Sequence, residues 1–74
     1  MSIEKNALAK KIGDNLREAR KFKNLTQKEV ASKLGMTQQQ YSRFENGIFE
    51  LNYTQIISLC QLYEMTPSEL FNLD

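Results

Sequence analysis

Residues 26–47 read TQKEVASKLGMTQQQYSRFENG, and this stretch decides the fold of the 74-residue chain. Thr26 precedes Glu29 by three residues, the spacing of a capping box, in which each side chain bonds the other residue's backbone amide. The same spacing recurs at residues 37–40. Gly35 lies between the two boxes, where glycine can adopt the left-handed backbone that ends a helix. The sequence therefore predicts two short helices joined by a tight turn.

The side chains between the two caps suit a close crossing of these helices. Ala31 lies four residues before Gly35, on the face that the second helix must approach, where a small side chain permits a steep crossing. Both residues are predicted to have structural roles. We expect the apolar contacts between the two helices to come from Val30, Leu34, Met36, Tyr41 and Phe44.

The stretch resembles the DNA-binding domain of the lambdoid phage repressor and Cro family, also called the xenobiotic-response-element family. The positions that match its motif are Thr26, Gln27, Glu29, Val30, Ala31, Leu34, Gly35, Thr37, Glu45 and Gly47. At Tyr41 and Phe44 many members have smaller aliphatic residues. Family domains carry one helix before the motif and two after it. The resemblance therefore implies an all-α, five-helix, lambda-repressor-like domain with a helix-turn-helix over residues 1–74.

The residues before the motif predict an amphipathic helix within residues 1–23. Its apolar stripe recurs every three or four residues and consists of Leu8, Ile12, Leu16 and Ala19. Ser2 and Asn6 are both acceptable N-caps, and residues 1–5 are expected to fray. Gly13 is predicted to weaken the helix interior by up to about 1 kcal/mol relative to alanine.

The ends of two helices are marked by residues that tolerate a left-handed backbone. Asn24 is expected to end the first helix, and Gly47 the second helix of the motif. A loop over residues 48–52 then leads to a strongly apolar helix. The predicted core face of that helix is Tyr53, Ile56, Ile57, Leu59, Cys60, Leu62 and either Tyr63 or Glu64.

A last short helix is predicted to start at Thr66, with Pro67 at its first position and Glu69 completing a capping box. So short a helix is stable only when it is docked. Its apolar side chains exceed what one side can bury, so Phe71 or Leu73 is expected to be available to a second subunit. We therefore predict a homodimer that forms through the C-terminal helices.

The composition argues against an enzyme and against a metal site. The chain contains no histidine and one cysteine, so it lacks the usual general base, cannot form an internal disulfide and offers no zinc-ligand cluster. We expect neither catalysis nor a cofactor. Cys60 lies on an apolar stripe and is predicted to be a small buried hydrophobe. With no apolar run near about 18 residues and no secretory leader, the expected location is the cytoplasm, without membrane contact.

The charges are divided between the two parts of the chain. Residues 1–43 carry ten basic and four acidic side chains, a net charge of +6, whereas residues 44–74 carry five acidic and no basic ones, a net charge of −5. A total of only +1 therefore does not argue against a nucleic-acid partner. The alternative interpretation is a solvated charged surface whose acidic end aids solubility.

The second helix of the motif is expected to enter the major groove of double-stranded DNA, since a helix over residues 37–46 would be about 15 Å long. Tyr41, Phe44 and Glu45 are expected to turn inward. The side chains left outward to read bases are Gln38, Gln39, Ser42 and Arg43, with Gln40 at the edge. Glutamine pairs bidentately with adenine and arginine with guanine. The alternative is that the glutamines are only solvated helix formers.

The resemblance implies roles for individual residues. In the most similar members, the positions matching Gln38, Gln39 and Arg43 read bases, while those matching Gln27 and Asn46 bind phosphates. Gln27 is also the first residue of its helix, where the helix N-terminus favours a phosphate. The predicted contacts to the DNA backbone are Gln27, Lys28, Thr37, Gln40 and Asn46. On charge alone, further candidates are Lys10, Lys11, Arg17 and Lys33.

Arg20 and Glu45 occupy positions that pair in these relatives. The resemblance thus implies a partly buried ion pair that ties the first helix to the recognition helix. We assign both residues to the architecture.

Together these observations predict a sequence-specific transcriptional regulator, a repressor that binds an inverted-repeat operator as a dimer. Half-sites centred about 34 Å apart would let two recognition helices enter successive major grooves. The alternative is a protein-interaction module, such as the antitoxin partner of a toxin. Its expected signature is an apolar surface around Phe22, Phe49 and Phe71.

Overall fold

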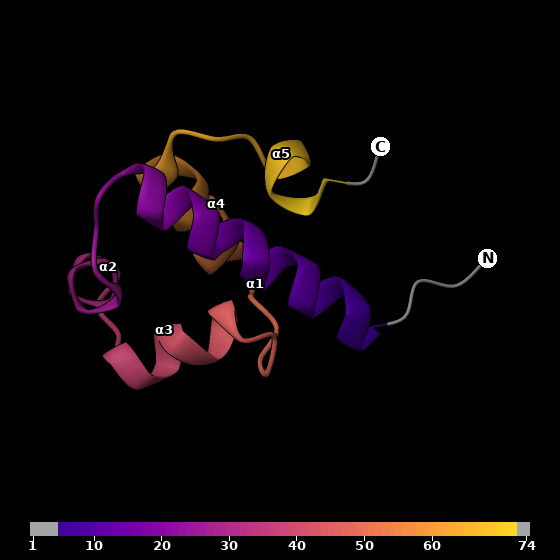
Figure 1. Cartoon of the computed structure of the whole chain (residues 1–74), viewed down its shortest axis with the longest axis horizontal. Helices are drawn as coiled ribbons and strands as arrows, with labels where there is room; N and C mark the ends of the chain where they lie inside the picture. The colour runs from indigo at the N-terminus through magenta and orange to yellow at the C-terminus, as the bar shows by residue number, and fades with distance from the viewer. Residues whose placement is uncertain (1–4, 73–74) are drawn as a thin grey trace.

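A long first helix forms the axis of the fold, and the third and fifth helices pack against it (Figure 1). The computed structural model describes residues 5–72 and measures 38 × 22 × 20 Å. Its elements are α1 (Lys5–Phe22), α2 (Gln27–Lys33), α3 (Gln38–Glu45), α4 (Tyr53–Tyr63) and α5 (Pro67–Phe71). Residues 5–72 contain no strand. The all-α, five-helix prediction is confirmed.

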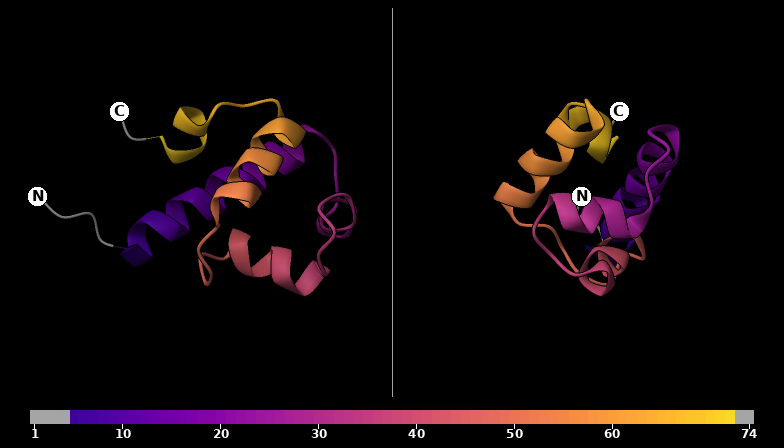
Figure 2. Two further views of the ribbon diagram at one scale, coloured as in Figure 1. Left: turned by 180° about the vertical axis from the view of Figure 1, so that it is seen from behind. Right: turned by 90° about the vertical axis from the view of Figure 1, so that its left-hand side faces the viewer.

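The α2 and α3 helices cross steeply. In Figure 1, α2 is seen end-on while α3 lies across the view. Both α3 and α5 pack on α1, and α4 packs on α5 (Figure 2). Figure 2 also shows α4 passing over α1 on the side away from the viewer of Figure 1. In the view of Figure 1 the α2 and α3 pair therefore lies below α1, α5 lies above it and α4 passes behind it.

The predicted helix starts are confirmed. Thr26, Thr37 and Thr66 each accept a hydrogen bond from the amide three residues on, and each capping box is complete. A fourth capping box, between Asn52 and Gln55, starts α4 and was not predicted. Every helix from α2 to α5 thus begins with a side chain that satisfies amides left unbonded by the helix itself.

The predicted helix ends are also confirmed. The φ angles of Asn24, Gly35 and Gly47 are 58°, 68° and 72°, all in the left-handed region. Glu64 and Asn72 adopt the same conformation at the ends of α4 and α5, which the sequence did not indicate. Left-handed residues turn the chain sharply, and this keeps the connections between helices short.

The predicted start of the first helix needs correction. Asn6 is not an N-cap, because it lies inside α1, which the structure describes from Lys5 onward. The other candidate cap, Ser2, lies outside the described residues, as do residues 1–4 of the segment expected to fray.

The core is built from all five helices. Its buried apolar members are Leu16, Val30, Ala31, Tyr41, Phe44, Leu59, Cys60, Tyr63 and Leu70. The predicted core face of α4 is wrong in two positions, since Tyr53 is 88% exposed and Ile57 is 51% exposed. The helix meets the core through Leu59, Cys60 and Tyr63, so the side of α4 that carries Tyr53 and Ile57 faces away. Burial raises the pKa of the Cys60 thiol, consistent with a small buried hydrophobe.

Gly13 marks the closest approach between α1 and the end of α3. A Cβ atom at this position would lie 2.3 Å from the carbonyl oxygen of Glu45 and 2.6 Å from that of Phe44. Both are backbone atoms, so neither can move without shifting α3. The glycine therefore permits a helix contact that a residue with a side chain would prevent.

We predict that Gly13→Ala destabilises the domain by about 1–3 kcal/mol, the usual cost of overpacking, despite the better helix propensity of alanine. Glu18→Ala is the matched control, because it places an alanine at an exposed position of the same helix, where it overpacks nothing. The free energies of unfolding from urea titration check this. A Gly13→Ala variant as stable as the parent would contradict the close approach.

Candidate nucleic-acid interface

The inward side of α3 is buried and its outward side is polar. Tyr41, Phe44 and Glu45 are buried, as expected. Gln38 and Gln39 on the opposite side are exposed, and the next turn adds Ser42 and Arg43, both partly exposed. The structure therefore brings the four predicted base-reading residues onto one outward face of a helix whose other face is anchored.

The first turn of α3 is occupied by its own cap. The Oγ1 of Thr37 accepts a hydrogen bond from the Gln40 amide at 3.1 Å, and the Oε1 of Gln40 accepts one from the Thr37 amide at 3.0 Å. Both side chains are exposed. The hydroxyl proton of Thr37 and the side-chain NH₂ of Gln40 remain available as donors to a phosphate.

Glu45 is the anchor of α3 and is fully buried. The Nε of Arg20 lies 2.7 Å from its Oε2, and the Nη2 of Arg20 donates to its Oε1 at 3.2 Å. The Nε2 of Gln27 donates to the same Oε1 at 3.0 Å. The predicted Arg20–Glu45 ion pair is confirmed and is bidentate, and Gln27 of α2 donates a third hydrogen bond to the same carboxylate.

The ionisation of this pair follows from its contacts. Burial by itself would raise the pKa of Glu45, but hydrogen bonds from Arg20, Tyr41 and Gln27 outweigh burial and hold the pKa below its usual value. The hydrogen bond to Glu45 in turn raises the pKa of Arg20. Both groups are therefore charged at neutral pH.

Two tyrosine hydroxyls extend this network to α4, which the sequence did not predict. The hydroxyl groups of Tyr41 and Tyr63 are hydrogen-bonded to each other in the core. Burial raises the pKa of Tyr63 to about 12 and also raises that of Tyr41, so both stay protonated. Tyr41 is one of the departures from the family motif, and its hydroxyl provides the link from Glu45 toward α4.

Asn46 is held by Arg17 at the C-terminal end of α3. The Nη2 of Arg17 donates to the Oδ1 of Asn46 at 3.1 Å and to the carbonyl oxygen of Glu45 at 3.4 Å. A guanidinium beside these carbonyl groups also interacts favourably with the negative end of the helix dipole. Arg17 was expected near phosphate on charge alone. The structure places it next to Asn46, a contact that spans 29 positions of sequence and had no local signal.

Arg43 lies over an aromatic ring from the loop that follows α3. Its guanidinium carbon is 5.2 Å from the centroid of the Phe49 ring, within the range of a cation–π interaction. Sequence reasoning missed this contact, although an aromatic residue six positions after an outward arginine was visible. The predicted base-reading residue therefore has a defined neighbour.

The basic side chains lie on different elements of the fold. Lys28 is exposed in the first turn of α2, beside Gln27, and Lys33 is exposed at the end of that helix. Lys10 lies where α1 meets Gly47, whose added Cβ would be 2.7 Å from the Lys10 Cα. By contrast, Lys23 forms an ion pair with Glu64 at 2.6 Å.

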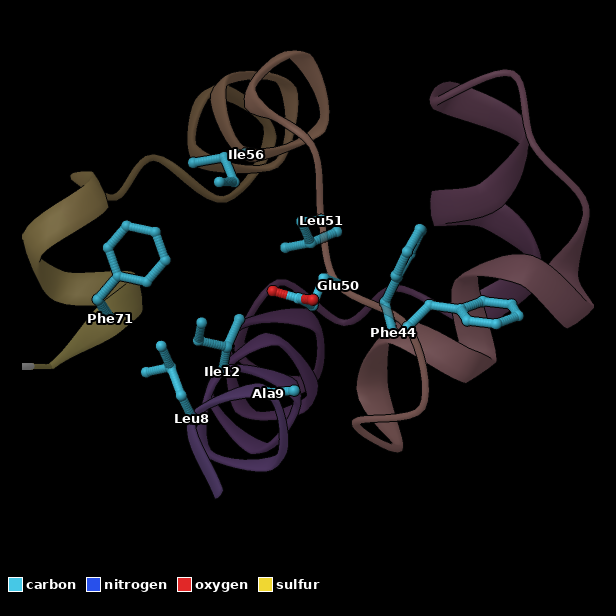
Figure 3. A pocket seen from close by; sticks show the side chains of 9 residues that line it. Leu8, Ala9, Ile12, Phe44, Glu50, Leu51, Ile56 and Phe71 are labelled. Atoms are coloured by element: carbon cyan, nitrogen blue, oxygen red, sulfur yellow. The ribbon is translucent and has the colours of Figure 1, made fainter. Parts of the chain in front are cut away.

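An apolar cavity of about 190 Å³ lies between α1, the loop after α3, α4 and α5. Figure 3 shows Phe71 of α5 facing Leu8 and Ile12 of α1 across it. Phe71 is thus partly buried against its own chain, and Leu73, its alternative as a dimer contact, lies outside the described residues. Phe49 lines the same cavity as Phe71, whereas Phe22 is 84% exposed at the far end of α1, so the three phenylalanines expected to form one apolar surface do not all lie together.

Two kinds of feature are not found in the part of the chain that the structure describes. Within residues 5–72, no three histidine, cysteine, aspartate or glutamate side chains gather closely enough to hold a metal ion. Over the same residues, no helix combines the length and the apolar character needed to cross a membrane.

We predict that Glu45→Ala destabilises the domain by about 3–5 kcal/mol, because it leaves the Arg20 guanidinium without its buried partner. Glu45→Gln is the control, since it keeps the shape and one of the two acceptor oxygens but removes the charge. The depressed pKa of Glu45 means that its contribution is complete above a pH of about 4.5 and is lost as the pH falls through its folded-state pKa. Thermal melts between pH 2 and 7 check this, and equal acid sensitivity of the parent and Glu45→Gln would contradict it.

Comparisons with known proteins agree with this geometry. A crystal structure of the restriction-modification controller protein C.AhdI from Aeromonas hydrophila superposes with a TM-score of 0.80 at 31% identity, over 88% of this chain and 98% of that one. The uncharacterised helix-turn-helix transcriptional regulator YqaE of Bacillus subtilis is 36% identical over 55 residues, which cover 74% of this chain and 47% of that protein. The antitoxin PezA of Streptococcus pneumoniae is 32% identical over 63 residues, 85% of this chain and 40% of the antitoxin.

The chain therefore spans less than half the length of these two curated relatives. A helix-turn-helix domain family model matches residues 13–74, which include α2, α3 and the Glu45 network. The chain belongs to the helix-turn-helix domain family.

Proposed function

We propose that this chain is a sequence-specific DNA-binding transcriptional regulator whose α3 enters the major groove. The observation that carries the proposal is the polar outward face of α3, held in place by the buried Glu45 on its other side. Support comes from the similarity to proteins named as a transcriptional regulator and a restriction-modification controller. The chain acts as a repressor when its operator overlaps a promoter.

Base reading is assigned to the outward face of α3. Gln38 and Gln39 are exposed in the first turn, where a helix that enters the groove by its N-terminal end places its side chains against base edges. A glutamine amide suits adenine N6 and N7, and the Arg43 guanidinium suits guanine O6 and N7. Ser42 lies between these groups and can donate or accept a hydrogen bond.

Binding to the phosphate backbone of DNA is assigned to residues at the start of α2 and at both ends of α3. Gln27 and Lys28 occupy the N-terminal turn of α2, where free amides and the helix dipole attract a phosphate. One side-chain N–H of Gln27 is used by Glu45, which leaves a second to reach outward. The remaining contacts are Thr37, Gln40 and Asn46, and Asn46 is oriented by Arg17.

Dimer formation is assigned to the exposed apolar face of α4. Tyr53 and Ile57 are one helical turn apart and both are more than half exposed. A two-fold contact through this face would pair the C-terminal halves and leave both α3 helices free to enter successive major grooves about 34 Å apart on an inverted repeat.

A second candidate is an antitoxin-like role in which a protein partner is the main ligand. The similarity to an antitoxin and the exposed Phe22 favour it. In that case the acidic residues after Arg43 would face the partner. Capture of one stoichiometric partner, without enrichment of any DNA sequence, would distinguish this role from that of a regulator.

We predict that selection from a random-sequence DNA pool enriches an inverted repeat. Gln39→Ala should relax the preference at one base position per half-site, since a bidentate pair discriminates by about 1–3 kcal/mol. Lys28→Ala should weaken binding to all sequences alike and lower the salt slope by about one. Quantitative binding at two salt concentrations checks both. Weak binding that no sequence improves, and that vanishes as salt rises, would refute the proposal.

We also predict that Ile57→Glu turns the dimer into a monomer and reduces affinity for the full operator to that for a half-site. The reason is that a charge would be buried in the subunit contact. Asn6→Glu introduces the same charge at an exposed position of α1 and should leave the assembly unchanged. Sedimentation velocity gives the assembly state. A dimer that survives Ile57→Glu would place the interface elsewhere.

A further inference from the structure

Phe49 is the residue that determines the surroundings of the Arg43 side chain. The guanidinium carbon lies 5.2 Å from the ring centroid, over its face. The aromatic face is therefore a contact that the structure offers to this charge.

The backbone after α3 brings the ring to this place. Gly47 turns the chain with a φ of 72°, and the amide of Ile48 then donates to the carbonyl oxygen of Arg43 at 2.9 Å. The turn is seated on α1, since a Cβ on Gly47 would meet the Lys10 Cα at 2.7 Å. The loop thus folds back along the same turn of helix that carries Arg43.

The other side of the ring is anchored in the protein. Phe49 lines the apolar cavity together with Phe44 and Leu51, and it also borders a groove that contains Met36 and Gln40. It is 46% exposed, so about half of its surface is covered by the protein. A half-buried ring can restrict a long, otherwise mobile side chain that lies over it.

We infer that Phe49 is a positioning residue that holds the Arg43 guanidinium ready to read a guanine, an inference that rests on the proposed function. The contact is made with the aromatic face, 5.2 Å from the guanidinium carbon, and not with a hydrogen-bond acceptor, so it satisfies none of the five N–H donors of Arg43. Two of those donors are the ones that pair with guanine O6 and N7. The ring therefore restricts the side chain without consuming a donor that base reading needs.

The test compares Phe49→Leu with Arg43→Ala and with the double variant, on the enriched operator and on a copy in which the base pair read by Arg43 is changed. Leucine keeps an apolar side chain in the cavity and removes the aromatic face. Phe49→Tyr restores the face and is the rescue control. Phe49→Met replaces Phe49→Leu if the latter does not fold, as judged by circular dichroism.

We expect Phe49→Leu to lower the preference for the intact guanine about two- to fivefold, with little change on the altered operator. Phe49→Tyr should keep the preference, and Phe49→Leu should have no further effect once Arg43 is alanine. A uniform loss of affinity on both operators, or effects that add in the double variant, would show a merely structural role and overturn the inference.

Two readouts separate this inference from the proposed function. If Arg43→Ala relaxes the base preference and Phe49→Leu does not, the positioning role fails while base reading by Arg43 stands. If Arg43→Ala leaves the preference unchanged, base reading by Arg43 fails first.

A separate measurement uses the free protein. Ring-current shifts of the Arg43 side-chain protons in NMR spectra should be present in the parent and in Phe49→Tyr and absent in Phe49→Leu. Their absence from the parent would overturn the contact without reference to DNA.

Discussion

A fully buried carboxylate has to be surrounded by hydrogen-bond donors, and in this protein that requirement sets the position of α3. Glu45 receives donors from Arg20 on α1 and from Gln27 on α2. Leaving such a charge without partners is strongly unfavourable, so the arrangement of the three helices that satisfies it is favoured over others. The polar side of α3 therefore faces outward, because the opposite side is held by this network and by the core.

The same network joins structure to the proposed DNA contacts. Gln27 donates to Glu45 from the N-terminal turn of α2, the place where a phosphate would bind. Arg17 holds Asn46 through one guanidinium nitrogen while its Nε lies 3.7 Å from Glu45. Side chains that would meet the DNA backbone are thus oriented by groups that also stabilise the fold, and the interface is largely preorganised.

Close backbone contacts complete the support of α3. Gly13 lets α1 approach the carbonyl groups at the end of that helix, and Gly47 lets the following loop rest on Lys10. Each contact needs the absence of a side chain at one position. The loop after Gly47 carries Phe49, whose ring lies 5.2 Å from the Arg43 guanidinium carbon. The close approach of α1 at Gly47 therefore helps to set the position of this ring.

The sequence by itself determined the local elements. The capping boxes at Thr26, Thr37 and Thr66 and the left-handed Asn24, Gly35 and Gly47 were readable because each depends on residues within one helical turn. The inward and outward faces of α3 were also predictable, since the helical period alone assigns them. The Arg20–Glu45 pair was predicted through the family resemblance, because local patterns do not show which distant charges meet.

Only the tertiary structure decided the remaining features. The exposure of Tyr53 and Ile57 depends on which side of an almost wholly apolar helix meets the core, and periodicity cannot rank the faces of such a helix. The tyrosine hydroxyl pair and the contact of Arg17 with Asn46 each join residues more than 20 positions apart. Gly13 appeared unfavourable within its helix and proved necessary between helices, because the space that it leaves belongs to another part of the chain.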